Sequence, residues 1–195
     1  KVDKGLADEE DGVQIMKPMP SLEGLLDRAR EAGVFGTKMR SVINSASASG
    51  IAAVVAQQFE VGNTILDHGL VPIIEPEVNI HAADKAECEE ILHAELLKHV
   101  NALPEGRKIM LKLTLPEKAN LYSDLITHDN VLRVVALSCG YDLAESCSRL
   151  SQNNGMISSF SRALTNDLNV SQSDEEFNSA LQNAIDKIFA ASSGN

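Results

Sequence analysis

The sequence has few of the residues that hold small proteins together through disulfides or zinc. Its three cysteines are Cys88, Cys139 and Cys147, and no two of them have the CxxC spacing of a zinc ribbon. An odd number of cysteines cannot all pair within one chain, so a disulfide framework is not expected. A reducing, cytoplasmic setting fits this cysteine usage.

Basic residues and long apolar runs are also scarce. Lys and Arg number 17 against 28 Asp and Glu, and the formal net charge is −11. A nucleic-acid surface needs clustered cations, so no nucleic-acid partner is expected. No run approaches the ~18 apolar residues of a membrane helix, so no membrane association is expected either. A small anionic ligand stays compatible with this balance, because one pocket can be basic in an acidic protein.

Motifs for metals and nucleotide cofactors are missing. The five histidines show neither HxH nor HExxH spacing, and His93 and His99 are six residues apart, which places them on opposite sides of a helix. The chain has no GxGxxG motif and no GxxxxGK motif followed by Ser or Thr. The sequence therefore supports neither a metal-dependent mechanism nor a nucleotide cofactor.

The chain does contain a regular alternation of short apolar strands and amphipathic helices. The expected strands cover 34–43, 70–78, 108–116, 131–138 and 156–160. The expected helices cover 21–33, 47–69, 84–103, 118–127, 142–152 and 173–189. This alternation predicts a parallel sheet with right-handed crossovers. With the end of a further strand at 1–5, it fits the later three quarters of a (β/α)₈ TIM barrel. We expect one domain, residues 1–195, without the first strands of the barrel.

The strand at 108–116 is apolar except for Lys112 in its middle. Burial disfavours the charged ammonium, and a free amine is a nucleophile toward a carbonyl carbon. Alternatively, Lys112 lies at a strand end where its ammonium reaches water or a carboxylate, which the strand by itself favours.

Charged or polar side chains fall near the downstream ends of nearly all strands. In a barrel these ends meet on the one face where active sites are built. The residues are Lys1, Lys38, Arg40, Glu75, Glu77, Lys112, Ser138 and Arg162.

If these groups converge, their chemistry suggests their roles. Lys112 would form an imine with a ketone, and Glu75 or Glu77 would transfer protons. Arg162 is suited to a phosphate, helped by Ser138 and by backbone amides around Gly140. Lys1 and Arg40 could hold a second phosphate across the pocket.

Each of these groups also has an ordinary structural explanation. The cations at positions 38 and 40 could simply form salt bridges with the carboxylates at 75 and 77, and Arg162 could cap a helix or bind a carboxylate.

Together these residues make the chain resemble class I (Schiff-base) fructose-1,6-bisphosphate aldolase in its bacterial form. The resemblance rests on six segments in the family's order: KVDKG at 1–5, FGTKMR at 35–40, VPIIEPE at 71–77, the 108–116 strand, ALSCG at 136–140 and FSRAL at 160–164. It covers essentially the whole chain.

The resemblance implies a metal-independent lyase of glycolysis and gluconeogenesis with no cofactor, usually a homo-oligomer. It would cleave fructose 1,6-bisphosphate reversibly into dihydroxyacetone phosphate and glyceraldehyde 3-phosphate. Lys112 would be the Schiff-base lysine, Glu75 the proton shuttle, Lys38 its electrostatic neighbour and Glu77 a supporting residue. The phosphate near the imine would meet Ser138, Gly140 and Arg162, and the far phosphate Lys1 and Arg40.

The chain departs from the family pattern at two places. Cys139 stands where the family usually has a glycine, which adds a side chain where backbone must approach a phosphate. The family's first-strand aspartate would lie upstream of Lys1, so we expect a fragment without its first strands.

Two other functions compete with this interpretation. The chain could be a Schiff-base aldolase for a different sugar phosphate, or a non-catalytic barrel relative that serves as a binding module.

Overall fold

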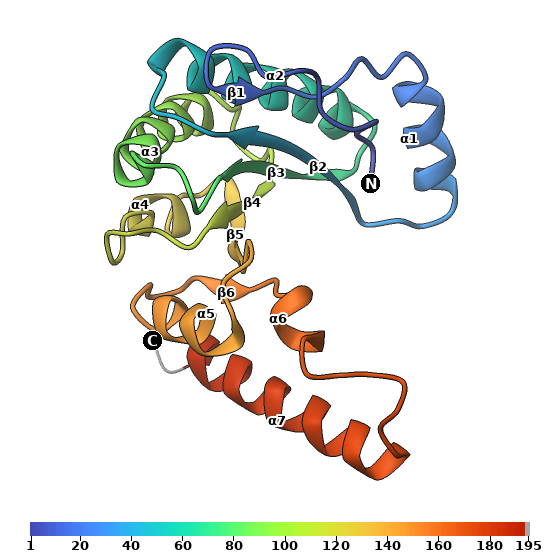
Figure 1. Cartoon of the computed structure of the whole chain (residues 1–195). Coiled ribbons are helices and arrows are strands. Elements are labelled where there is room, and N and C mark those ends of the chain that lie inside the picture. The colour runs from blue at the N-terminus through green and yellow to red at the C-terminus, as the bar shows by residue number, and fades with distance from the viewer. Residues whose placement is uncertain (194–195) are drawn as a thin grey trace.

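The computed structural model describes residues 1–193 and has a six-stranded sheet at its centre (Figure 1). The strands are β1 (Val13–Gln14), β2 (Gly36–Ile43), β3 (Val71–Val78), β4 (Ile109–Thr114), β5 (Val131–Leu137) and β6 (Ile157–Ser158). From β2 to β6 every strand pairs in parallel with the next strand in the chain, and β1 is antiparallel to β2. Because the strand order never reverses, each crossover moves one place in the same direction, as in a (β/α)₈ barrel.

Helices connect the strands and cover one face of the sheet. They are α1 (Leu22–Glu31), α2 (Ala48–Asp67), α3 (Lys85–Asn101), α4 (Ser123–Ile126), α5 (Leu143–Leu150), α6 (Arg162–Thr165) and α7 (Asp174–Ser193). Met39, Ile74, Leu111 and Val134, one from each central strand, are fully buried in the core. In the described part of the chain, no helix is both long and apolar enough to cross a membrane.

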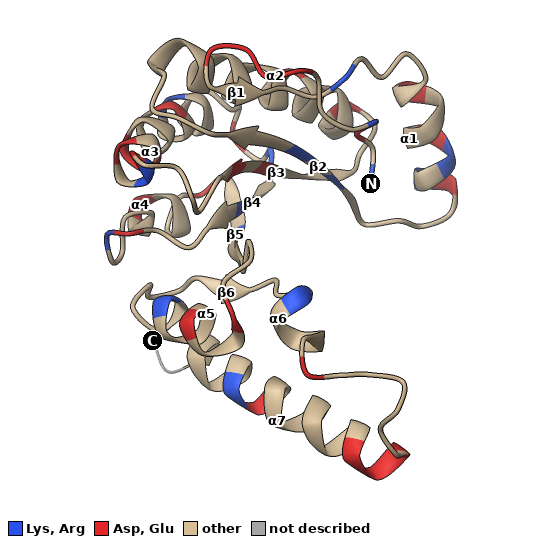
Figure 2. Ribbon diagram, in the orientation of Figure 1, with Lys and Arg blue, Asp and Glu red and all other residues tan. Residues whose placement is uncertain are grey.

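The two faces of β2 differ in burial, and this difference positions the site. Burial alternates strictly along the strand, with Met39 and Ser41 buried and Lys38 and Arg40 partly exposed. Successive side chains of a strand point to opposite faces, so both cations lie on the face away from the helical layer. Most other charged residues lie on helices and loops, whereas β2 and β3 carry theirs within the sheet (Figure 2).

The N-terminal segment differs from the sequence prediction. No strand is assigned at residues 1–5, although the Val2 amide donates to the Lys38 carbonyl oxygen at 3.0 Å along the edge of β2. The short strand β1 was not predicted. It follows a tight turn at Asp11-Gly12, where both residues have positive φ and Glu10 pairs with Val13. The Asp-Gly pair is a hairpin signal that the sequence analysis overlooked.

The C-terminal helix α7 begins as predicted. The Ser173 hydroxyl accepts from the Glu176 amide at 3.3 Å, and the Glu176 carboxylate accepts from the Ser173 amide at 2.9 Å, which completes a capping box. The predicted apolar face is only partly covered, because Ala184 and Ile188 are buried but Phe189 is exposed. The helix packs against α5, α6 and β6.

Candidate functional site

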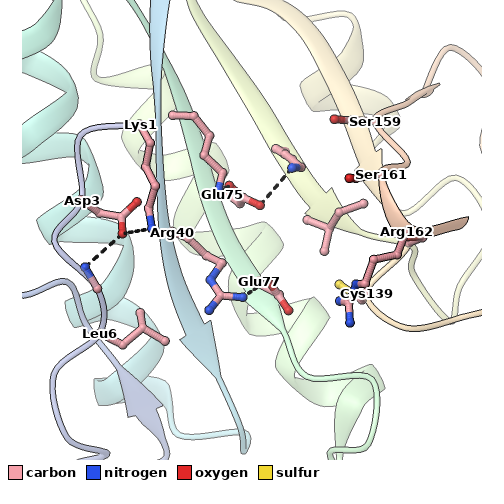
Figure 3. A pocket seen from close by; sticks show the side chains of 15 residues that line it. Lys1, Asp3, Leu6, Arg40, Glu75, Glu77, Cys139, Ser159, Ser161 and Arg162 are labelled. Carbon is pink, nitrogen blue, oxygen red and sulfur yellow. Dashed lines mark hydrogen bonds and ion pairs between the residues drawn. The ribbon is translucent and has the colours of Figure 1, made fainter. Parts of the chain in front are cut away.

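A cavity of about 390 Å³ lies at the carboxyl ends of the parallel strands, between the N-terminal segment and α6 (Figure 3). Eight of the nine predicted site residues line it; Gly140 does not. The lining residues are Lys1, Asp3, Gly5, Leu6, Lys38, Arg40, Glu75, Glu77, Lys112, Leu137, Ser138, Cys139, Ser159, Ser161 and Arg162. Side chains from successive strands therefore converge on one cavity. Lys38 differs from the sequence prediction, because it lies near the start of β2 (Gly36–Ile43) and not at its downstream end.

The centre of the cavity is one carboxylate between two ammonium groups. Glu75 Oε2 lies 3.0 Å from Lys38 Nζ, and Glu75 Oε1 lies 3.2 Å from Lys112 Nζ. The Glu75 residue is only 2% exposed, and the Lys112 side chain is 18% exposed. Lys112 is thus neither fully buried nor in bulk water, and its amine faces the cavity beside a shielded carboxylate.

The backbone of Glu75 is held from behind by helix α2. The Glu75 amide donates to Gln58 Oε1 at 2.7 Å, and Gln58 Nε2 donates to the Ser41 hydroxyl at 3.1 Å. Gln58 is fully buried, so an amide side chain here satisfies strand polar groups that water cannot reach. Sequence reasoning missed Gln58, because a polar residue in a helix is more often exposed.

A second ion pair lies further along the same two strands. Arg40 Nη1 donates to Glu77 Oε2 at 3.1 Å, as Lys38 pairs with Glu75 two residues earlier. The salt bridges considered as the structural alternative are therefore present. The first pair differs from an ordinary rim pair because Glu75 is shielded from solvent and faces a second lysine.

Asp3 is a lining residue that sequence reasoning did not single out. Its Oδ1 lies 3.3 Å from Lys1 Nζ and accepts the Gly5 amide at 3.2 Å. Asp3 is buried, so it holds the Lys1 ammonium at the edge of the cavity. The available signal was its position two residues after Lys1, which puts both side chains on the same side of an extended chain.

The opposite side of the cavity is formed by the loop after β5 and by the start of α6. Ser138 is buried, and Ser159 and Ser161 line the wall beside the exposed Arg162 (Figure 3). No carboxylate among residues 1–193 pairs with the Arg162 guanidinium. It therefore keeps its donors for an anion in the cavity.

Cys139 and Gly140 form a turn with unusual backbone angles. Their φ values are 51° and 112°, and the Tyr141 amide donates to the Ser138 carbonyl oxygen at 2.9 Å. A positive φ is strained for Cys139 and natural for glycine. Burial, together with the charge of Glu77, raises the pKa of the Cys139 thiol to about 12, so the thiol is neutral.

The cavity carries more positive than negative charge. Five cationic side chains line it (Lys1, Lys38, Arg40, Lys112 and Arg162), against three carboxylates (Asp3, Glu75 and Glu77), a formal excess of two positive charges. The whole chain has a net charge of −11. A basic pocket in an acidic protein favours a small anion. Among residues 1–193, no group of three or more His, Cys, Asp or Glu is placed to hold a metal ion.

Comparisons with known proteins agree with this geometry. No family model matches the chain. Over 192 residues it is 59% identical to the fructose-bisphosphate aldolase class 1 of Synechocystis sp., covering 98% of this chain and 64% of the relative. It is 53% identical to the fructose-bisphosphate aldolase class 1 of Clostridium acetobutylicum, and this match covers 98% of this chain and 65% of the relative. The chain thus spans 64–65% of the length of these curated relatives.

A solved structure shows the same fold. The fructose-bisphosphate aldolase of Plasmodium falciparum, solved in complex with TRAP and a small-molecule inhibitor, superposes with a TM-score of 0.77. The match covers 99% of this chain and 67% of that chain, at 21% identity. The α/β sheet described here therefore corresponds to part of an aldolase TIM barrel.

Proposed function

We propose that this chain, which is related in sequence to the class 1 fructose-bisphosphate aldolases, carries the imine-forming site of such an enzyme. The activity would be the reversible cleavage of fructose 1,6-bisphosphate into dihydroxyacetone phosphate and glyceraldehyde 3-phosphate, as a metal-independent lyase. The observation that carries the proposal is the Lys112 amine 3.2 Å from the shielded Glu75 carboxylate, inside a cavity with an excess of positive charge.

The first steps can be assigned to particular side chains. The Lys112 amine, after losing a proton, attacks the ketone carbon of the sugar and forms a carbinolamine. Glu75, 3.2 Å from the Lys112 amine, would take the proton that the ammonium loses and return it to the hydroxyl of the carbinolamine, so that water leaves and an iminium forms. Lys38 on the other oxygen of Glu75 keeps that carboxylate oriented toward Lys112 through the exchange.

The iminium then acts as an electron sink. When the bond between the third and fourth sugar carbons breaks, its electron pair moves to the nitrogen and gives an enamine, and glyceraldehyde 3-phosphate leaves. The proton on the fourth-carbon hydroxyl must leave in this step. The family resemblance implies an aspartate upstream of Lys1 for that proton.

The two phosphates fit the two sides of the cavity. Arg162 and Ser138 would bind the phosphate near the imine, with Gly140 supplying the backbone turn that holds Ser138. Lys1 and Arg40, from the other side of the Glu75 centre, would bind the far phosphate (Figure 3). Glu77 would keep Arg40 in place through their ion pair. A cytoplasmic homo-oligomer acting in glycolysis and gluconeogenesis follows from the same proposal.

Trapping of the imine tests the proposal. The intact protein is incubated with dihydroxyacetone phosphate, reduced with borohydride and digested, and adducts are mapped by mass spectrometry. We expect one adduct, on Lys112. An adduct on another lysine only, or no adduct, contradicts the mechanism.

A substrate panel separates the rival aldolases. We expect removal of the far phosphate from the ketose to raise KM, and Arg40→Met to abolish this preference. Equal use of ketoses with one and two phosphates would favour an aldolase for another sugar phosphate. Adduct formation without turnover of any ketose would favour a binding module.

A further inference from the structure

The hydrogen-bonded ladder between β3 and β4 stops at the catalytic pair. Strands β2 and β3 stay in register from Gly36↔Val71 to Ile43↔Val78. By contrast, β3 and β4 are paired only at Ile73↔Met110 and Ile74↔Leu111. The next residues on the two strands are Glu75 and Lys112. The backbone pairing therefore ends at the point where these two side chains meet.

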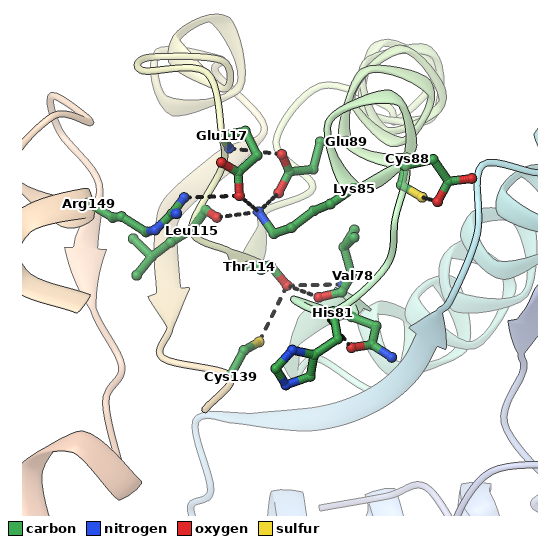
Figure 4. A network of polar contacts seen from close by, with 12 residues as sticks. Val78, His81, Lys85, Cys88, Glu89, Thr114, Leu115, Glu117, Cys139 and Arg149 are labelled. Carbon is green, nitrogen blue, oxygen red and sulfur yellow. Dashed lines mark hydrogen bonds and ion pairs between the residues drawn. The ribbon is translucent and has the colours of Figure 1, made fainter. Parts of the chain in front are cut away.

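One side chain joins β3 and β4 beyond the end of their backbone pairing. The Thr114 hydroxyl accepts the Val78 amide at 3.0 Å and donates to the Val78 carbonyl oxygen at 2.9 Å (Figure 4). Thr114 is almost completely buried and lies two residues after Lys112, so both point to the same face of β4. Its hydroxyl takes the place of the missing backbone pairing.

The same hydroxyl also reaches the loop after β5. Cys139 Sγ lies 3.4 Å from Thr114 Oγ1. A hydroxyl has one proton, and here that proton goes to the Val78 carbonyl, so the thiol must be the donor. The raised pKa of Cys139 agrees with a thiol that keeps its proton. One oxygen thus joins β3, β4 and the loop that carries Ser138.

We propose that Thr114 is a positioning residue: its hydroxyl fixes the separation of β3 and β4 at which Glu75 contacts Lys112, and holds the Ser138 loop through the Cys139 thiol. The inference rests on the proposed function for the role of Lys112, and adds a residue to that site. The hydrogen bonds of Thr114 within residues 1–193 go to Val78 and Cys139, and not to Lys112 or Glu75, so Thr114 acts through the strands that carry these two residues.

Three variants test this role. Thr114→Val keeps the shape but leaves both Val78 backbone groups without their partner, and Thr114→Ser keeps the hydroxyl. Thr37→Val is the matched control, because Thr37 is also a buried strand threonine and its hydroxyl has no hydrogen-bond partner among residues 1–193. Thr37 belongs to the helix-facing side of β2 and does not line the cavity.

The first readout needs no substrate. Acylation of the Lys112 amine is followed at fixed pH by mass spectrometry. A Lys112 amine released from its contact with Glu75 is more accessible to the reagent, so we expect acylation at Lys112 to become about threefold faster or more in Thr114→Val. Thr114→Ser and Thr37→Val should match the wild type. Alkylation of Cys139 should also accelerate in Thr114→Val only, with buried Cys88 as the internal standard.

The second readout is the rate of imine trapping with dihydroxyacetone phosphate, measured on folded protein. We expect a drop of about tenfold or more in Thr114→Val, with recovery in Thr114→Ser. If Thr114→Val only lowers stability and leaves acylation and trapping unchanged, the positioning role is wrong. If the wild type forms no adduct while the acylation pattern holds, the proposed function fails and the positioning of Lys112 by Thr114 stands.

Discussion

Two clusters of lysines and carboxylates inside this protein combine the two kinds of group in opposite proportions. At the cavity, the single carboxylate of Glu75 contacts two ammonium groups, at 3.0 and 3.2 Å. Behind the end of β4, the single ammonium of Lys85 contacts two carboxylates, Glu89 at 2.5 Å and Glu117 at 3.1 Å. The first arrangement has too few acceptors for its donors, and the second has enough.

Lys85 is saturated by its neighbours. Its Nζ also donates to the Leu115 carbonyl oxygen at 2.9 Å, so its three protons face three acceptors (Figure 4). Arg149 lies 3.0 Å from Glu117 and balances its charge. All donors of this buried ammonium are held by protein acceptors, and Lys85 does not line the cavity, so the amine has no path to a substrate. Its role is to hold the loop after β4 against α3 and α5.

Lys112 differs from Lys85 because part of its amine faces the cavity and not a protein acceptor. Within residues 1–193 its one ion-pair partner is Glu75, which it shares with Lys38, and the rest of its amine faces the cavity. A nucleophile needs an approach path and a nearby proton acceptor, and both are present here. The groups around each ammonium, and not burial alone, therefore distinguish a reactive lysine from a structural one.

The largest expected effect is on the chemistry of the cavity lysine. Lys112→Arg keeps a cation beside Glu75 but replaces the amine with a guanidinium that cannot form the imine. Imine trapping should fall to background, by about 10³-fold or more. The unfolding free energy, measured by urea denaturation, should change by less than about 1 kcal/mol. A strongly destabilised Lys112→Arg protein would contradict the contrast between the two lysines.

Lys85→Met should show the reverse pattern. It leaves Glu89 buried without its cation, and breaking a buried pair costs about 3–5 kcal/mol of unfolding free energy. Trapping at Lys112, measured per folded molecule, should stay within about threefold of the wild type, because Lys85 does not line the cavity. Lys98→Met is the matched control: the Lys98 side chain is 68% exposed beside Glu95, so its removal should cost less than about 0.5 kcal/mol.

The sequence was sufficient for the cavity and insufficient for the Lys85 cluster, for a physical reason. Strand periodicity places Lys38 with Arg40, and Glu75 with Glu77, on one face, and parallel topology brings strand ends together. These are local patterns. The contact of Lys85 with Glu117 joins residues 32 positions apart, in a helix and in a loop without periodicity, so only the folded chain reveals it.

The start of helix α2 could be predicted from the local sequence, whereas the backbone angles of Cys139 could not. The helix expected over 47–69 begins at the residue that caps α2, because the Ser47 hydroxyl accepts the Gly50 amide at 3.1 Å. The positive φ of Cys139 was not predicted from the residue type, because it is imposed by the turn between β5 and α5. The Thr114 bridge was missed because a threonine in a strand is ordinarily explained by its strand propensity.

A smaller effect is expected from the shared carboxylate. Glu75→Gln keeps the side-chain shape, but an amide cannot transfer protons and gives the two ammonium groups no counter-charge. We expect the rate of imine trapping to fall about 10²-fold. Glu77→Gln is the control from the same face of β3: Glu77 pairs with Arg40, so its loss should lower the trapping rate by less than about tenfold and act mainly on KM. An equal fall in trapping rate in both variants would mean that the position of Glu75 between two lysines gives it no particular role in imine formation.

The smallest expected effect is a pH dependence of stability in the Lys85 cluster. Burial raises the pKa of Glu89, and this outweighs its hydrogen bonds to Glu117 and Lys85. Burial also opposes ionisation of Glu117, but the hydrogen bonds and charges of Lys85 and Arg149 together outweigh it, so the Glu117 pKa is lowered. The two carboxylates of one ammonium therefore shift in opposite directions.

The sign of the Glu89 contribution follows from proton linkage. Above the ordinary value of 4.5, folded Glu89 still holds a proton that the unfolded chain has lost, so the unfolding free energy falls as pH rises through this window. Glu89→Gln removes this pH-dependent fall in the unfolding free energy, because a glutamine side chain does not titrate. Its destabilisation relative to wild type, measured in urea denaturation curves, should be greatest at and below pH 4.5 and should shrink as pH rises above this value. Parallel pH curves for the two proteins would mean that folding leaves the pKa of Glu89 unchanged. A destabilisation that grows as pH rises would mean that Lys85, rather than burial, dominates this pKa.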